Sequence, residues 1–255
     1  MSIVIRPCRT FEELDACVAL QSQVWGFEDA DVIPRRALVV ARKIGGQVIG
    51  AFDQATLIGF AMALPGVLPG NPPGCYLHSH MLAVDPRYRN QGIGRQLKLA
   101  QREDALARHL QQMEWTFDPL EIKNSFLNIE KLGAIVRRYT PDHYGVSSSR
   151  LQAGLPTDRL HAEWWMRSSR VNAILSDGAR PIYNIEQTIL IPAEIAQWKT
   201  SEATFAQAAE AQLDCRSRFQ AAFARGLAVV GFKTDSRGNG IFELASWQPS
   251  WKESQ

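Results

Sequence analysis

The spacing of apolar positions changes along the chain, and each change predicts a new element. Apolar residues from Leu14 to Val24 recur every three or four positions, which is typical of a helix with one buried face. Thr10 precedes this face and Glu13 stands three residues later, which is the pattern of a capping box. Gly26 follows the last apolar position, so we expect the helix to end there.

Strand-like and helix-like segments continue through the first two thirds of the chain. Apolar runs predict the strands, and segments rich in Gly and Pro predict the joints between them. Around the first helix we expect a strand at 3–6, a helix from Pro34 to about residue 45, strands at 48–53 and 57–64 joined by 54–56, a loop at 65–74, a strand at 76–84, a helix from Ile93 to about Leu110, a strand at 114–117, a short helix at 124–132, and strands at 134–139 and 160–166.

The last third of the chain predicts a smaller α+β unit. We expect a strand at 185–191, a helix at about 201–225, and strands at 228–233 and 241–244. Asp235-Ser236-Arg237-Gly238-Asn239-Gly240 joins the last two strands and indicates a hairpin. The sequence therefore predicts an α+β protein with a mixed sheet, divided into a domain at 1–168 and a C-terminal α+β extension at 169–255 of unknown role.

A strand, a glycine-containing turn and a helix follow one another directly in the middle of the first domain. The strand ends in Leu82-Ala83-Val84, Asp85-Pro86 stops it, and Gly92 and Gly94 lie where the helix begins. Amides at a helix start have no partner within the helix and lie at the positive end of its dipole. Glycines there allow a phosphate oxygen to approach closely. The arrangement predicts a site for a ligand that carries a diphosphate, and the alternative is an ordinary strand-turn-helix joint with no ligand.

Composition narrows the class of protein without identifying it. The 255 residues are 45% hydrophobic and 21% charged, which is typical of a globular protein with a substantial core. A net charge of +2 gives no argument for binding nucleic acid or an anionic membrane. Four cysteines without paired or metal-like spacing predict reduced, mostly buried thiols. With no apolar run of membrane-spanning length and no signal-peptide pattern, we expect a cytoplasmic protein.

Other phosphate-binding motifs fit the sequence less well. No Gly-x-x-x-x-Gly-Lys-Ser/Thr segment occurs, so a P-loop enzyme has no support. The dinucleotide fingerprint requires a third glycine three residues after Gly94, where Leu97 stands.

Arg89-x-x-Gly92-x-Gly94, placed after a strand that ends in Leu82-Ala83-Val84, resembles the acyl-CoA-binding signature of the GNAT (Gcn5-related) N-acyltransferase superfamily. The resemblance covers about residues 1–168. The whole pattern is most similar to a group of bacterial proteins predicted to be GNAT acetyltransferases with a C-terminal extension. It implies the GNAT fold, acetyl-CoA or another acyl-CoA as co-substrate, no metal, and transfer of an acyl group to a primary amine of a small molecule. Acetyl is the default, and a dicarboxylic acyl group such as succinyl would need one extra cation near the thioester.

The resemblance also implies which residues contact coenzyme A. Pantetheine would pair with the end of the strand at Leu82, Ala83 and Val84. The diphosphate would lie against Arg89, Asn90, Gln91, Gly92, Ile93, Gly94 and Arg95. Asn124 and Asn128 could hold the pantetheine amides. Two alternatives stay open, since Arg89 could be a solvated surface arginine and Asn124 could be only a helix cap.

His78 is the first candidate for the catalytic base. It lies six residues before Val84, where several GNAT enzymes carry a carboxylate base, and an imidazole titrates near neutral pH. His80 is expected on the same side of the strand. The alternative for both is a hydrogen-bonded core histidine. The tyrosine that many GNAT enzymes use as the acid is replaced by Ile129, so Tyr139, His143 or Tyr144 could substitute, with Tyr144 kept as the catalytic candidate, or the thiolate could leave without an acid.

Aromatic and basic residues in the second half offer an acceptor pocket. Trp164 and Trp165, with Glu163 and Arg167, could line it, although at least one tryptophan is expected in the core. Arg216 and Arg218 could pair with a substrate carboxylate, but a solvated helix face explains them as well and is favoured.

Three other functions stay open beside the small-molecule enzyme. The chain could be a catalytically silent module that binds acyl-CoA as a sensor, a protein N-acyltransferase whose extension recognises its partner, or a protein with a vestigial pocket and a C-terminal dimerisation element. A homodimer is compatible with each of them.

Overall fold

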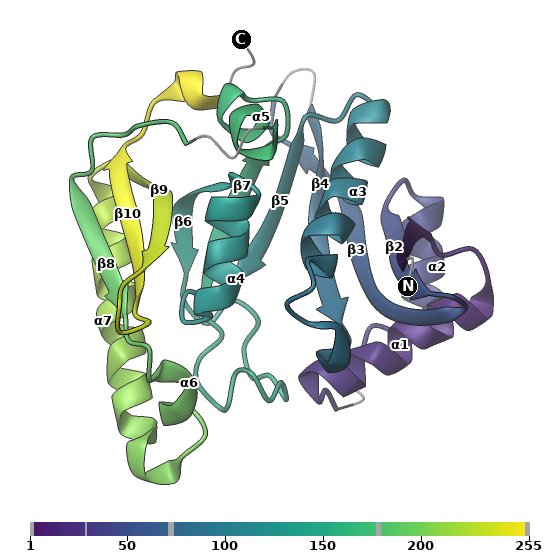
Figure 1. Ribbon diagram of the computed structural model, residues 1–255, viewed down its shortest axis with the longest axis horizontal. Helices are drawn as coiled ribbons and strands as arrows, with labels where there is room; N and C mark the ends of the chain where they lie inside the picture. Colours follow the sequence, from purple (N-terminus) through teal and green to yellow (C-terminus); the bar gives the residue numbers. More distant parts are fainter. Residues whose placement is uncertain (1–2, 29, 71–73, 177–179, 253–255) are drawn as a thin grey trace. The chain divides into compact units, whose positions relative to one another are not determined.

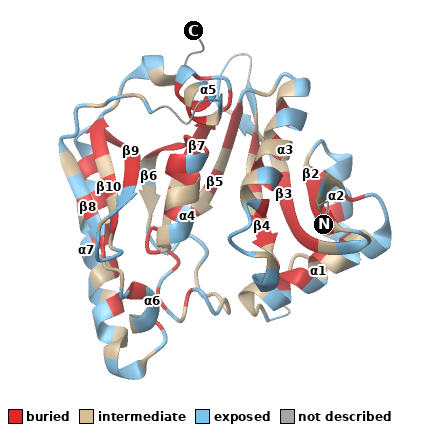
Figure 2. Ribbon diagram, in the orientation of Figure 1, coloured by how far each residue is buried: buried red, intermediate tan, exposed pale blue. Residues whose placement is uncertain are grey.

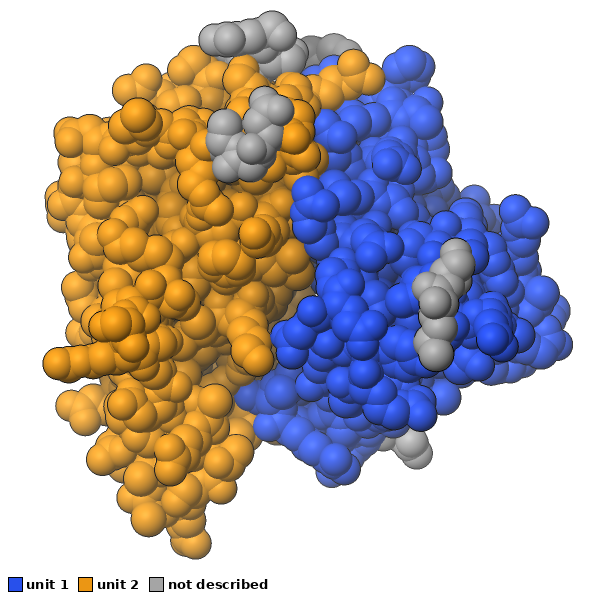
Figure 3. All heavy atoms as spheres, in the orientation of Figure 1, with its two compact units in different colours: residues 1–114, 148–151 blue, residues 115–147, 152–255 orange. Residues whose placement is uncertain are grey.

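The computed structural model describes residues 3–28, 30–70, 74–176 and 180–252, and it has the expected α+β fold (Figure 1). Contacts within the chain divide it into two compact units, which Figure 3 shows in blue and orange. The first contains residues 1–114 and 148–151, and the second contains residues 115–147 and 152–255. The chain passes from the first unit to the second within strand β5 (Gln112–Phe117).

Unit 1 is a sheet with helices on both faces. Its strands are β1 (Ile3–Pro7), β2 (Gln47–Asp53), β3 (Thr56–Leu68), β4 (Gly74–Val84) and the start of β5. They lie in this order, and the successive pairs from β1 to β4 are antiparallel, whereas β4 and β5 are parallel. The helices are α1 (Phe11–Trp25), α2 (Arg35–Lys43), the short 3₁₀ turn η1 (Pro86–Tyr88) and α3 (Ile93–Ala107).

Local sequence signals in unit 1 act as expected. The Thr10 hydroxyl accepts the Glu13 N–H at 3.3 Å, and the Glu13 carboxylate accepts the Thr10 N–H at 3.4 Å. This capping box fixes the start of α1. At its other end Gly26 has φ +67° and donates its N–H to the Ser22 carbonyl. Helix α1 therefore begins and ends where the sequence predicts.

The loop expected at 65–74 is wrong for its first half. Strand β3 continues through Pro65 to Leu68, paired with β4 as far as Gly74. At Gly66 the ring of Tyr76 lies where a Cβ atom would stand, so the glycine makes room for its partner strand. Proline and glycine argue locally against a strand, but pairing with β4 overrides that preference.

The cores of unit 1 lie on the two faces of its sheet, shown by the buried positions in Figure 2. One face packs Leu14, Cys17 and Leu38 from α1 and α2 against the sheet. The other packs Ile93 and Leu97 of α3 against it. Helix α3, which follows the glycine turn, is thus held against the sheet by buried apolar contacts in its first half.

Unit 2 has its own strands and helices. Its strands are β6 (Ile135–Thr140), β7 (Arg159–Trp165), β8 (Gln187–Ile191), β9 (Leu227–Thr234) and β10 (Gly240–Ser246), in the order β7-β6-β9-β10-β8. Its helical segments are α4 (Ile122–Phe126), the π-helix η2 (Leu127–Lys131), α5 (Ser169–Ser176), α6 (Ile195–Trp198), η3 (Glu202–Thr204), α7 (Phe205–Ala224) and η4 (Pro249–Lys252).

The predicted hairpin of the extension is confirmed, because β9 and β10 are antiparallel neighbours. The Asp235 carboxylate closes their joint by accepting the N–H groups of Arg237 and Asn239. β9 also pairs with β6, which places the extension in the same sheet as the preceding residues of unit 2. Helices α5 and α6 were not expected from the sequence. All four cysteines are free, and three of them are buried while Cys75 is exposed.

Candidate active site

Buried polar contacts fix the turn that follows β4. Asp85 is 3% exposed, and its carboxylate caps η1 by accepting the Arg87 N–H at 2.9 Å. It also pairs with the Arg87 guanidinium at 2.7 Å, and these bonds lower its pKa. The Tyr88 hydroxyl donates to Asp53 of β2 at 2.9 Å. The turn is therefore held at its start before the residues of the glycine motif begin.

The glycine motif brings backbone amides to the start of α3. Asn90 and Gly92 have φ values of +61° and +77°, so the chain turns through two left-handed residues before the helix. The first helical hydrogen bond runs from the Gln96 N–H to the Gly92 carbonyl at 3.0 Å. The N–H groups of Ile93 and Gly94 precede this bond and lie at the positive end of the helix dipole.

Exposure along the motif fits an anion site at this helix start. Four residues of the motif are exposed, namely Arg89, Asn90, Gln91 and Gly92. Gly94 and Arg95 are half-buried, and Ile93 is buried. The buried Ile93 side chain anchors the helix to the sheet, so its amide end is fixed while the opposite side stays accessible. A diphosphate would meet a preformed site here.

The end of β4 extends past its described pairing with β5. That pairing joins Leu77 to Met113 and His78 to Glu114. Among the described residues, none on β5 is paired with Leu82, Ala83 or Val84, although all three pair with β3. The backbone groups on the other edge of this segment are therefore outside the described ladder, which is what addition of an extended ligand requires.

The two candidate histidines lie next to each other on β4. Their ring centroids are 6.1 Å apart and both side chains are half-buried. The register of β3 against β4 shifts from Met62–Met81 to Ala63–Ser79, so His80 is the extra residue of a β-bulge. Burial lowers the pKa of His80, which favours the neutral imidazole that can accept a proton.

A buried lysine lies below this part of β4. Lys98 of α3 is 2% exposed, and its Nζ donates to the Ser79 hydroxyl at 2.7 Å. The hydroxyl in turn donates to the Gln101 side-chain carbonyl at 2.9 Å. Ser79 stands between the two histidines in sequence, so this network fixes the strand at the bulge. Sequence patterns did not reveal it, because Lys98 occupies a position that reads as a solvated helix residue.

Lys98→Met is expected to stabilise the protein near neutral pH. Burial lowers the pKa of Lys98 well below its ordinary value, so the unfolded chain binds more protons than the folded protein between that lowered pKa and about 10.4. Wild-type stability should rise with pH through this window, and the advantage of Lys98→Met should shrink from about pH 7 to about pH 9.5. Urea unfolding at both pH values measures it, and an advantage that grows with pH would contradict the assignment.

The two asparagines lie in the helical segment of unit 2. Helix α4 begins after Glu121, so the alternative of Asn124 as its cap is wrong. The Asn128 side chain is buried and accepts the indole N–H of Trp115 at 3.1 Å. Its amide donates to the exposed Asn124 side chain at 3.4 Å. Asn124 therefore keeps an accessible polar group, whereas Asn128 serves mainly to position it.

Ile129 stands where many GNAT enzymes carry a tyrosine, and the nearby tyrosines differ in how well they could act as the general acid. Ile129 is fully buried, and no proton can come from its side chain. The Tyr139 hydroxyl donates to Asp158 at 2.6 Å, and burial raises its pKa above the ordinary value. Tyr144 is 46% exposed, and its hydroxyl lies 2.8 Å from the Thr116 hydroxyl of β5. Of the two tyrosines, Tyr144 is the accessible one.

The tryptophan pocket expected from the sequence is largely core. Trp164 is fully buried, donates to the Leu132 carbonyl at 2.7 Å, and packs edge to face on Trp115. Glu163 is buried and forms an ion pair with Arg137 at 2.7 Å. Trp165 faces the ammonium group of Lys252 at 4.7 Å. These contacts stabilise unit 2 and leave no acceptor role for Trp164 or Glu163.

The two arginines of α7 already have partners. Arg216 binds both carboxylate oxygens of the fully buried Asp158, at 2.8 and 2.9 Å. Arg218 donates to the Thr188 carbonyl and lies 3.6 Å from Asp214. The substrate-binding alternative for Arg216 is wrong because its guanidinium is committed to Asp158.

A mixed sheet whose fourth strand ends in a left-handed glycine turn and an open helix start presents backbone amides to an anionic ligand. Residues 35–125, which contain the turn and both histidines, match the family model of the acetyltransferase (GNAT) domain. This part of the chain therefore matches the family that its motif predicts. No curated protein sequence matches the chain.

Solved structures with the same fold cover about two thirds of the chain. A GNAT-family protein from Desulfovibrio desulfuricans has 12% identity and a TM-score of 0.51, covering 64% of this chain and 99% of its own. NAA60 from Arabidopsis thaliana, in complex with a bisubstrate analogue, has 13% identity and a TM-score of 0.51, with coverage of 64% and 98%. The yncA protein from Salmonella typhimurium, with acetyl-CoA as its cofactor, has 14% identity and a TM-score of 0.50, with coverage of 65% and 95%.

None of the helices in the described part of the chain is long and apolar enough to cross a bilayer.

Proposed function

We propose that the protein transfers an acyl group, acetyl by default, from acyl-CoA to a primary amine of a small molecule in the cytoplasm. The observation that carries the proposal is the amide end of α3, fixed behind Gly92 at the end of β4. Arg89 to Arg95 would hold the diphosphate, and Leu82 to Val84 would pair with the pantetheine arm. Both segments belong to unit 1, so one preformed surface would bind the length of the cofactor.

The chemistry requires few protein groups because the thioester is already activated. The amine nitrogen attacks the thioester carbonyl carbon, a C–N bond forms, and the C–S bond breaks to release the CoA thiolate. His78 would accept the proton of the ammonium group, directly or through water, with His80 beside it. Tyr144 would return a proton to the thiolate, or water would do so. Positioning of the two reactants would supply the rest of the rate.

Release of free CoA thiol tests the proposal. Purified protein with acetyl-CoA or succinyl-CoA and a panel of small amines should release thiol faster than either reactant alone. His78→Gln should lower kcat about 100-fold or more, since a positioned base contributes that much. His109→Gln, an exposed histidine on the loop after α3, is the matched control and should leave kcat unchanged. Equal rates for His78→Gln and wild type would show that His78 is not the catalytic base.

The buried Ile129 at the usual tyrosine position supports one alternative function. A sensor module would bind acyl-CoA and need no acid. It would show thermal stabilisation by CoA with no thiol release from any acceptor. A protein N-acyltransferase would instead release thiol with peptides and not with small amines, so the same assay separates the three functions.

A further inference from the structure

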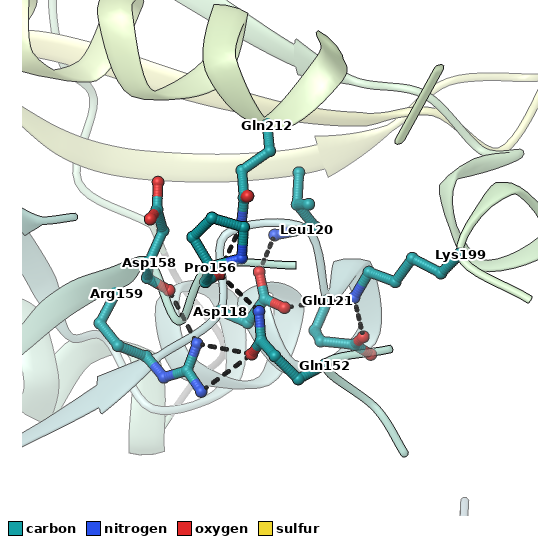
Figure 4. Close-up of polar contacts among 9 residues, drawn as sticks. All are labelled: Asp118, Leu120, Glu121, Gln152, Pro156, Asp158, Arg159, Lys199 and Gln212. Atoms are coloured by element: carbon teal, nitrogen blue, oxygen red, sulfur yellow. Dashed lines mark hydrogen bonds and ion pairs between the residues drawn. The ribbon is translucent and has the colours of Figure 1, made fainter. Parts of the chain in front are cut away.

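Arg159, the first residue of β7, carries a guanidinium group held by neutral partners. Its Nη1 and Nη2 both lie 3.2 Å from the Gln152 side-chain carbonyl, and Nη1 donates to the Asp158 backbone carbonyl at 2.8 Å (Figure 4). The ring of Tyr144 lies 5.5 Å from its central carbon. Among the residues that the structure describes, none of these partners is a carboxylate.

Buried groups hold this guanidinium in place. Gln152 is 3% exposed, and its amide donates to the Pro156 carbonyl at 2.6 Å. Gln212 of α7, which is 2% exposed, donates to the same carbonyl at 2.9 Å. Figure 4 shows Gln152 between the arginine and this shared oxygen. The Gln152 side chain that contacts Arg159 is thus itself held by a buried hydrogen-bond network. A surface arginine without a binding role would not require such a network.

The carboxylates near Arg159 are bound elsewhere. Asp158 accepts from Arg216, from the Tyr139 hydroxyl and from the Asp142 backbone N–H. Asp142 accepts the N–H and the hydroxyl of Thr157. Among the contacts of the described residues, Arg159 forms an ion pair with neither acid. The pKa of His143 is lowered mainly by burial, and the positive charge of Arg159 lowers it further.

The surroundings of Arg159 are those of a binding surface for a small polar group. Tyr144 presents its hydroxyl beside the Thr116 hydroxyl of β5. The His143 ring packs edge to face on Tyr144 at 4.5 Å and on His161 at 5.3 Å. The candidate acid Tyr144 therefore belongs to the same surface of unit 2 as Arg159.

We propose that Arg159 binds a carboxylate of the substrate, carried either by the acceptor amine or by the acyl group. The inference rests on the proposed function and names the substrate class of that site. A fixed guanidinium pairs with a carboxylate through two parallel N–H bonds, and its partial exposure leaves it accessible. It also gives the C-terminal extension a role, because Gln212 and Arg216 of α7 hold Pro156 and Asp158, which precede Arg159 in the chain.

Paired probes that differ only in the carboxylate test the proposal. Alanine and phenylalanine are compared with alaninamide and phenylalaninamide as acceptors, each with acetyl-CoA and with succinyl-CoA, by thiol release. Arg159→Gln should lower kcat/KM about 30-fold for every reaction that supplies the recognised carboxylate, mainly through KM. Arg159→Lys should restore part of the loss. Arg225→Gln is the matched control, since Arg225 also donates to a glutamine carbonyl, that of Gln187, and should change nothing.

The comparison of acceptors and the comparison of acyl donors together identify the source of the carboxylate. A loss confined to the amino acids, with their amides unaffected, assigns Arg159 to the acceptor. A loss confined to succinyl-CoA, whichever acceptor is used, assigns it to the acyl group. Equal effects on all reactions, or none, would overturn the inference while the proposed function stands. Absence of thiol release by wild-type protein from every probe would overturn both, and thermal unfolding of each variant shows that it is folded.

Discussion

Gly94→Asp is expected to lower the affinity for coenzyme A about 100-fold while the free protein stays as stable as wild type or becomes slightly more stable. Gly94 is the second residue of α3, where a carboxylate interacts favourably with the helix dipole and gains about 0.3–1 kcal/mol. Any residue other than Gly or Pro also favours the helix more than glycine does. The same carboxylate would repel a bound diphosphate, and about 3 kcal/mol of repulsion corresponds to the expected loss.

Titration calorimetry with CoA and thermal unfolding without it measure the two effects separately. Gly94→Asn is the control, because it has nearly the same size and no charge, and it should lose much less affinity than Gly94→Asp. If both variants bind CoA as wild type does, the diphosphate lies elsewhere and the motif has no ligand role. If both lose affinity equally, bulk rather than charge is responsible.

The parts of unit 1 that sequence reasoning recovered depend on local chemistry. The capping box of Thr10 and Glu13, the end of α1 at Gly26 and the glycine-containing turn before α3 each depend on residues that are close in sequence. Their structural outcome follows from hydrogen-bonding groups and backbone conformations that each residue type allows. The candidate cofactor motif is of this kind, and for that reason it could be placed in the sequence before the fold was seen.

The parts that sequence reasoning missed depend on partners far along the chain. β3 continues through Pro65 only because β4 pairs with it. Lys98 reads as a solvated residue until the turn of α3 places it over Ser79. Arg216 reads as a surface residue until β7 brings Asp158 beneath it, 58 residues away. Hydrophobic spacing says which face is buried, but it does not say which polar group will lie opposite.

Arg159 shows the same limit at the candidate site. Its sequence neighbours gave no reason to single it out, because the property that matters is the absence of a carboxylate among its described contacts. The neighbouring acid Asp158 has its carboxylate bound by Arg216. The extension therefore acts on the residues near Tyr144 through the ion pair between Arg216 and the buried Asp158. A substitution at this ion pair tests how much α7 contributes to unit 2.

Asp158→Ala is expected to lower the free energy of unfolding by about 3–5 kcal/mol. The Asp158 side chain is fully buried, and its loss leaves the Arg216 guanidinium, the Tyr139 hydroxyl and the Asp142 N–H without their acceptor. Asp214→Ala is the matched control, since Asp214 also faces an arginine of α7, but across an exposed pair at 3.6 Å worth about 0.5 kcal/mol or less. Chemical denaturation of both variants measures the difference. Equal, small losses would mean that the buried pair contributes no more than the exposed one, and that α7 does not hold the start of β7.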